Sequence, residues 1–141
     1  MSTPIEPYVS YANGSSHSTY NLSSPICAIY DPNGELVSLQ GNFISHSTNN
    51  ITEYNVMIEL LPDAISHGIR RIVIRLNSQL LVLQLTNFYS VRSPTMFCMF
   101  LRVCLLERHF DYIQYQHISR SLNTLTGALA NYVLDKHLGH M

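Results

Sequence analysis

Charge is scarce in this sequence, and basic charge does not exceed acidic charge. Charged residues make up 12% of the 141 residues, with 8 Lys and Arg against 9 Asp and Glu, for a formal net charge of −1. Binding to a nucleic-acid duplex draws much of its affinity from cationic side chains that neutralise phosphates. The missing basic surplus therefore predicts weak nucleic-acid binding by this domain alone, although a basic neighbouring domain would change that balance.

Long apolar runs and paired cysteines are absent as well. No apolar run approaches the ~18 residues of a membrane span, and the N-terminal MSTPIEPY lacks the basic and apolar regions of a signal peptide. We therefore expect no membrane association and an intracellular location, cytoplasmic or nuclear. Cys27, Cys98 and Cys104 have no zinc-type spacing, and we interpret all three as structural. Cys104 is expected to be buried on the apolar face of a helix.

The composition that remains is that of a globular protein. Hydrophobic residues make up 46% of the chain, which excludes an intrinsically disordered protein. A length of 141 residues suits one domain with a sizeable core. Residues 1–7 hold two prolines and no periodicity, so we interpret them as a loose leader. Residues 8–141 are assigned to a single domain.

Alternation, turn residues and helical spacing predict the order of the secondary-structure elements. The predicted elements are strands at 8–12, 25–30 and 35–44, a helix at about 51–67, a strand at 71–76, a helix at about 78–85, a helix from residue 94, a strand at 112–118 and a final helix marked by Leu125, Leu129, Tyr132 and Val133. Residues 13–16 are expected to end the first strand, and residues 31–34 to form a turn. The first three strands are expected to be antiparallel.

The helices carry start and stop signals of their own. Pro62 lies inside the first helix, where proline costs ~3 kcal/mol, and is expected to kink it. Gly68 is placed to end that helix. Ser93 and Pro94 are typical of an N-cap and a first helical position. The predicted buried stripe of the helix after Pro94 consists of Phe97, Phe100, Leu101, Cys104 and Leu105.

A set of ordered motifs runs along most of the chain. They are Thr48-Asn49-Asn50, Glu53-Tyr54, Ser78-Gln79-Leu80, Tyr89-x-Val91-Arg92-x-Pro94, Leu101-Arg102-Val103, Leu105-Leu106-Glu107-Arg108, His117-Ile118-x-Arg120, Asn123 and Ala130-Asn131-Tyr132-Val133-Leu134-Asp135. They cover roughly residues 8 to 137, and together they resemble type I ribonuclease H, especially the form in plant long-terminal-repeat retrotransposons. The resemblance implies an α/β fold, a mixed five-stranded sheet flanked by helices, which agrees with the order βββαβααβα.

The resemblance also implies where the catalytic groups would lie. Ribonuclease H enzymes hold two Mg²⁺ ions with four carboxylates, and the ions activate a water and stabilise the leaving oxygen. The four positions correspond to Asn13, Glu53 on the first turn of its helix, Asn77 and Gly127. Only Glu53 is a carboxylate, and neutral amides offset little of the charge on two such cations. Tight binding of two ions is therefore not expected, and no cofactor is expected unless the chain is active.

Several polar residues match positions that face nucleic acid in this family. They are Thr48, Asn49, Asn50, Ser78, Gln79, His117 and Arg120. Arg120 is the strongest candidate for a phosphate contact, because a fixed guanidinium suits phosphate. The Asn-rich segment before Glu53 is equally well explained as a turn that caps the helix, and His117 as a residue that hydrogen bonds at a strand end.

Three readings of function follow from these residues. The first is a catalytically disabled ribonuclease H-like domain of retroelement origin that binds an RNA–DNA hybrid or serves as a structural tether beside a reverse transcriptase. The second is an active or weakly active Mg²⁺-dependent ribonuclease H, and the third is a decayed fragment that merely folds. Nothing in the sequence demands an oligomer, and we expect a monomer.

Overall fold

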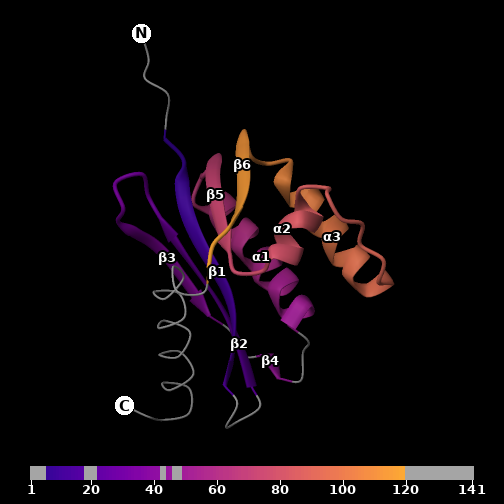
Figure 1. The fold of residues 1–141 in the computed structure, drawn as a ribbon. Coiled ribbons are helices and arrows are strands. Elements are labelled where there is room, and N and C mark those ends of the chain that lie inside the picture. The colour runs from indigo at the N-terminus through magenta and orange to yellow at the C-terminus, as the bar shows by residue number, and fades with distance from the viewer. Residues whose placement is uncertain (1–5, 18–21, 42–43, 46–48, 120–141) are drawn as a thin grey trace.

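The computed structural model of this chain describes residues 6–17, 22–41, 44–45 and 49–119 (Figure 1). Its strands form one mixed sheet in the order β3-β2-β1-β5-β6. The five strands of that path are β1 (Tyr8–His17), β2 (Leu22–Tyr30), β3 (Leu36–Gly41), β5 (Arg71–Leu76) and β6 (Tyr112–His117). A two-residue strand, β4 (Ile44–Ser45), also pairs with β2. The predicted mixed sheet is confirmed: β1, β2 and β3 are antiparallel, whereas β1, β5 and β6 are parallel.

Three helices cover one face of this sheet. They are α1 (Asn49–Ser66), α2 (Gln79–Leu85) and α3 (Pro94–Glu107). Helix α1 packs on β1 and β2, and α3 packs on α1 (Figure 1). The predicted final helix lies outside the described residues. None of the helices in the described part of the chain is long and apolar enough to cross a membrane.

The first two strands are longer than the sequence predicted. Strand β1 does not end at residue 12, because its antiparallel pairing with β2 continues from Val9↔Tyr30 to His17↔Leu22. The predicted third strand at 35–44 corresponds to β3, which ends at Gly41, and to β4, which pairs with the start of β2. The turn between β2 and β3 is confirmed. Asp31 Oδ1 accepts hydrogen bonds at 2.9 Å from the backbone of Asn33 and Glu35, and Gly34 has φ +86°.

Helix α1 begins and ends with clear local causes. It begins at Asn49, two residues earlier than predicted, so Glu53 is its fifth residue and does not lie in the first turn. Pro62 lies inside the helix, which continues to Ser66. Gly68, at φ +74°, donates to Ile65 O at 3.0 Å, and Ile69 donates to Ala64 O at 3.1 Å. These bonds form a Schellman motif, which confirms the predicted stop at Gly68.

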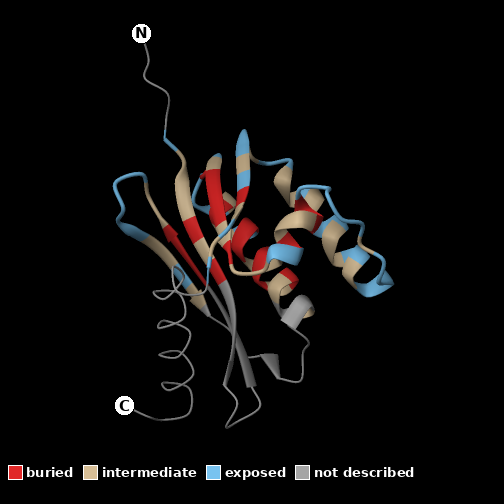
Figure 2. Ribbon diagram, viewed as in Figure 1, coloured by how far each residue is buried: buried red, intermediate tan, exposed pale blue. Residues whose placement is uncertain are grey.

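The hydrophobic core lies between α1 and the helix side of the sheet (Figure 2). Of the apolar residues that recur at helical spacing along α1, Tyr54, Met57, Leu61 and Ala64 are fully buried, while Ile58 and Ile65 are half-buried. The central strand contributes Ile72 and Ile74, both 0% exposed. Leu60 and Ile29 complete the centre of this core.

Helix α3 turns a different face toward the core than the sequence predicted. Its N-terminus is confirmed, since Ser93 Oγ accepts from Met96 N at 3.4 Å and Pro94 follows. However, Phe97, Leu101 and Leu105 are 44%, 44% and 60% exposed, so the predicted stripe is wrong at these three residues. Val103 is the fully buried residue of α3, and Met96, Met99, Leu106 and Phe100, which belongs to the predicted stripe, pack against the core. Cys104 lies between the two faces and is half-buried rather than buried.

Candidate functional site

Strands β5 and β6 end side by side, at the point where the parallel pairing of β1 with β5 also ends. Ala12 pairs with Leu76, and Leu76 pairs with His117. Asn13 and Asn77 are therefore the first residues beyond the parallel pairing of β1 and β5. In α/β sheets, ligands commonly bind outside the carboxyl ends of parallel strands. The register thus brings together the backbone of three residues that the sequence singled out, although Asn13 lies inside β1 rather than at its end.

Hydrogen bonds hold the end of β6 against the end of β5. The His117 ring donates from Nε2 to the backbone oxygen of Asn77 at 3.0 Å, and Ile118 N donates to Leu76 O at 2.9 Å. Because a carbonyl oxygen only accepts, this contact places the proton of a neutral His117 ring on Nε2. The exposed His117 therefore acts at a strand end, as one of the two interpretations of this residue predicted.

Helix α2 begins directly after Asn77. Ser78 is its N-cap, and its hydroxyl accepts from Leu81 N at 3.1 Å, while Gln79 is the exposed first residue of the helix. A capped start of this kind satisfies one of the backbone N–H groups that a helix leaves free. The predicted helix opening at Asn77-Ser78 is confirmed, and the Ser78 hydroxyl already has a structural role.

Glu53 lies on α1, half-buried and next to the fully buried Tyr54. The Tyr54 hydroxyl donates to Gln84 Oε1 at 2.7 Å, which fixes α1 against α2. Burial, with a smaller contribution from Cys104, raises the pKa of Tyr54 to about 12. The tyrosine is thus a neutral hydrogen-bond donor at physiological pH. Of the other predicted site residues, Asn49 and Asn50 open α1, while Thr48, Arg120 and Gly127 lie outside the described residues.

The acidic residues of the described chain serve other purposes. Asp31 caps a turn, and Asp63 accepts from Ser38 Oγ at 2.5 Å. Asp111 receives two hydrogen bonds from Arg70, which lower its pKa. Within residues 6–17, 22–41, 44–45 and 49–119, no group of three or more His, Cys, Asp or Glu residues could hold a metal ion.

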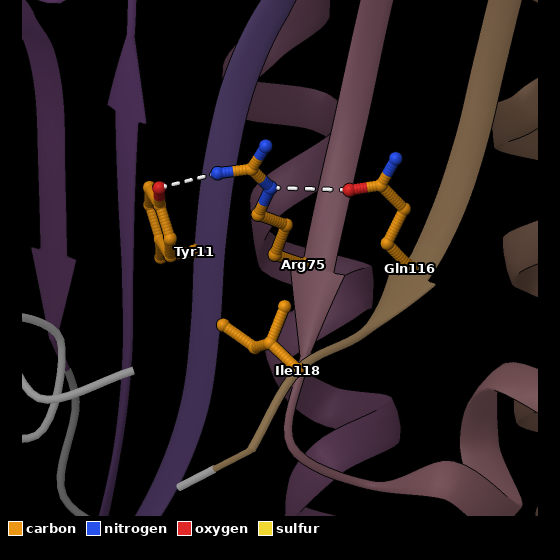
Figure 3. A pocket seen from close by; sticks show the side chains of 4 residues that line it. All are labelled: Tyr11, Arg75, Gln116 and Ile118. Carbon is orange, nitrogen blue, oxygen red and sulfur yellow. Dashed lines mark hydrogen bonds between the residues drawn. The ribbon is translucent and has the colours of Figure 1, made fainter. Parts of the chain in front are cut away.

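Sequence reasoning missed a pocket on the sheet face opposite the helices. It has a volume of about 340 Å³ and is lined by Tyr11, Arg75, Gln116 and Ile118 (Figure 3). Arg75 donates from Nε to Gln116 Oε1 at 3.1 Å and from Nη1 to the Tyr11 hydroxyl at 2.7 Å. Its guanidinium lies 5.5 Å from the centroid of the Tyr11 ring. The signal in the sequence was an arginine inside an otherwise apolar strand, Ile72 to Leu76.

Comparison with known proteins gives consistent matches. The model of the reverse transcriptase-like family matches residues 12–133. Ribonuclease HI of Halobacterium salinarum is 30% identical over 125 residues, which are 89% of this chain and 63% of that protein. The bifunctional protein Rv2228c of Mycobacterium tuberculosis is 30% identical over 92 residues, 65% of this chain and 25% of that protein. The chain therefore spans less than two thirds of the length of these relatives.

Solved structures agree with the sequence matches. RNase H1 from Halobacterium salinarum superposes with a TM-score of 0.83 at 29% identity, over 93% of this chain and 99% of that one. LC11-RNase H1, solved in complex with an RNA/DNA hybrid, gives 0.82 at 26% identity, with the same coverage of both chains. Prototype foamy virus protease-reverse transcriptase shares the fold alone, at 12% identity and a TM-score of 0.65 over 21% of its chain. This chain is thus a member of the reverse transcriptase-like family, with a ribonuclease H-like domain.

Proposed function

We propose that this chain is a nucleic-acid-binding ribonuclease H-like domain of retroelement origin that does not cleave its substrate. The observation that supports this most directly is the parallel register, which sets Asn13 and Asn77 next to each other at the end of β1–β5 pairing. In this proposal the two asparagines, with Glu53 and Gly127, occupy the four catalytic positions of a ribonuclease H. The framework of the site is kept and most of its carboxylates are lost.

These residues do not fit a pair of Mg²⁺ ions. Magnesium requires oxygen ligands, and bridging two ions requires anionic ones. Asn13 and Asn77 offer neutral amides, Gly127 offers no side chain, and Glu53 alone is a carboxylate. The acids that the structure describes are also not clustered for metal binding. In this proposal Glu53 is a weak metal ligand at most, and the domain works without a cofactor.

Binding of an RNA–DNA hybrid, or a role beside a reverse transcriptase, would remain. Hybrid binding is supported by the similarity to LC11-RNase H1, whose structure contains an RNA/DNA hybrid. The family description and the motifs shared with plant retrotransposons support the retroelement origin. In this proposal Thr48, Asn49, Asn50, Gln79, His117 and Arg120 contact nucleic acid, whereas Ser78 mainly caps α2. The domain would act as an intracellular monomer that spans residues 8–141.

An active Mg²⁺-dependent ribonuclease H is the alternative. It is favoured by the relatives named ribonuclease HI and RNase H1. Against it stands the unit-like behaviour of catalytic groups, in which the loss of one member removes most of the activity.

Cleavage of a labelled RNA–DNA hybrid with Mg²⁺ or Mn²⁺ separates the two proposals. The present chain is compared with a triple variant, Asn13→Asp, Asn77→Asp and Gly127→Asp. We expect no cleavage by the present chain and metal-dependent cleavage by the triple variant. Cleavage by the present chain would establish the alternative. If a folded triple variant is also inactive, the assignment of the four positions is wrong.

A further inference from the structure

The pocket around Arg75 lies beside the hydrogen bonds that close the strand ends, and Ile118 takes part in both. Tyr11, Arg75 and Gln116 occupy one row across three neighbouring strands, since Tyr11 pairs with Arg75 and Arg75 with Gln116. Figure 3 shows their side chains on the side of the sheet away from α1. The row lies one residue before Leu76, so the pocket adjoins the strand ends where Asn77 lies.

The Arg75 guanidinium carries a charge that its known contacts do not neutralise. Its two hydrogen-bond partners, Tyr11 and Gln116, are both neutral. Within the described residues, ion pairs join His67 to Asp63 and Arg70 to Asp111, and Arg75 has no carboxylate partner among these residues. Arginine has five N–H donors, and the hydrogen bonds of Arg75 to described residues use two of them. A half-buried cation with spare donors at the wall of a pocket is suited to an anion.

Both neutral partners fix the orientation of this cation. The Tyr11 hydroxyl and the Gln116 amide lie on opposite sides of Arg75, and the Tyr11 ring adds a cation–π contact. A guanidinium held in this way loses little conformational freedom when it binds a ligand, and its planar fork matches the oxygens of a phosphate. A simple structural tie between the strands would need only the donors already used.

We propose that this pocket binds a phosphate group of a nucleic-acid strand through Arg75. The proposal rests on the nucleic-acid-binding function above and identifies a contact for it. A site with a single carboxylate cannot recruit cations to balance a phosphodiester, and Arg75 supplies positive charge from the protein itself. Arg75 is thus a binding residue beside the former catalytic positions.

The test follows the Arg75 Nε–H signal in a ¹H–¹⁵N spectrum of the isotopically labelled full chain. A short RNA–DNA hybrid and inorganic phosphate are the two probes, both titrated at low salt. We expect the hybrid to shift this signal. Arg75→Gln should weaken hybrid binding by about tenfold or more and lower the salt slope by about one. Arg75→Lys keeps the charge but loses the planar fork of the guanidinium. Its affinity for the hybrid should lie between that of the unmodified chain and that of Arg75→Gln.

Arg102→Gln is the matched control, because it removes the same charge from an exposed position on α3. Equal weakening by Arg102→Gln and Arg75→Gln would reduce the effect to net charge and overturn the proposal. Hybrid binding without a shift of the Arg75 signal would also overturn it, while the proposed function would stand. A shift with inorganic phosphate but no hybrid binding would refute the nucleic-acid function and the nucleic-acid source of the phosphate. The spectra of the unmodified chain give these answers even if Arg75→Gln does not fold.

Discussion

The two faces of the central sheet differ in what their side chains do. On the face toward the helices, Ala12, Ile74 and Leu76 are at most 3% exposed and pack in the core. On the other face, the adjacent residues Tyr11 and Arg75 line a pocket together with Gln116 and Ile118. Because side chains alternate along a strand, neighbouring residues of β5 belong to these different environments. Strand β5 therefore contributes Ile72, Ile74 and Leu76 to the core and Arg75 to a candidate binding surface.

Replacing neighbours on β5 is the strongest test of this difference. Ile74→Ala should lower the free energy of unfolding by about 2–5 kcal/mol, because it leaves a cavity in a fully packed region. Arg75→Ala, one residue away, should cost only ~1 kcal/mol, since its hydrogen bonds are part-buried. Urea unfolding measures both values. Ile74→Val, expected at about 0.5–1.5 kcal/mol, is the control for a small loss of volume.

Similar losses for Ile74→Ala and Arg75→Ala would contradict the division of the two faces. Such a result would mean that the row of Tyr11, Arg75 and Gln116 holds the strands together as firmly as the core does. The pocket would then have a structural role only.

The next largest loss of stability is expected at the polar pair of Tyr54 and Gln84, which lies between α1 and α2. Tyr54→Phe removes the hydroxyl that bonds Gln84, which is 6% exposed and would lose its partner. We expect a loss of about 1–3 kcal/mol in thermal or urea unfolding. Adding Gln84→Met to Tyr54→Phe should recover much of this loss, because both polar groups are then replaced by apolar ones. If Tyr54→Phe left the free energy of unfolding unchanged, the hydrogen bond from Tyr54 to Gln84 would contribute nothing to holding α1 against α2.

The sequence predicted those parts of the fold that have local causes. Strand β5 has the predicted bounds because a β-branched run lies between Arg71 and Leu76, and α1 ends where Gly68 allows a positive φ. The extent of β1 could not be predicted in this way, because it depends on pairing with β2 rather than on its own residues. The face of α3 was ambiguous, since Phe97-Leu101-Leu105 and Met96-Phe100-Val103 both have helical spacing, and the packing against α1 decides between them.

The candidate site was predictable only in part for a similar reason. A motif places Asn77, Ser78 and His117 in the chain, and the parallel register then brings the ends of β5 and β6 together as the family resemblance implied. The Arg75 pocket needs side chains from three strands whose order in space is not their order in sequence. No local pattern around Arg75 reveals Tyr11 and Gln116 as its partners.

The smallest expected effect on stability concerns the carboxyl group of Glu107, at the contact between α3 and β6. The Tyr115 hydroxyl donates to Glu107 Oε2 at 2.5 Å, which joins β6 to α3. Burial raises the pKa of Glu107 above its ordinary value, and the bond from Tyr115 opposes this rise. The folded state therefore binds a proton more readily than the unfolded state, so this group adds stability as the pH falls through its folded pKa toward the ordinary value.

Glu107→Gln tests that sign, because it keeps an acceptor for Tyr115 and removes the charge. At pH 7 we expect no change or a gain below about 1 kcal/mol in the free energy of unfolding, since the group is only half-buried and water screens its charge. The pH dependence of stability just above the ordinary pKa of a glutamate should also become flatter. Glu107→Ala, which leaves the buried Tyr115 hydroxyl without its acceptor, should instead lose about 1–3 kcal/mol. If Glu107→Gln and Glu107→Ala destabilise the domain equally, the charge of Glu107 itself stabilises the contact between β6 and α3. The helix side of the sheet would then accept a charged side chain as readily as the opposite side accepts Arg75.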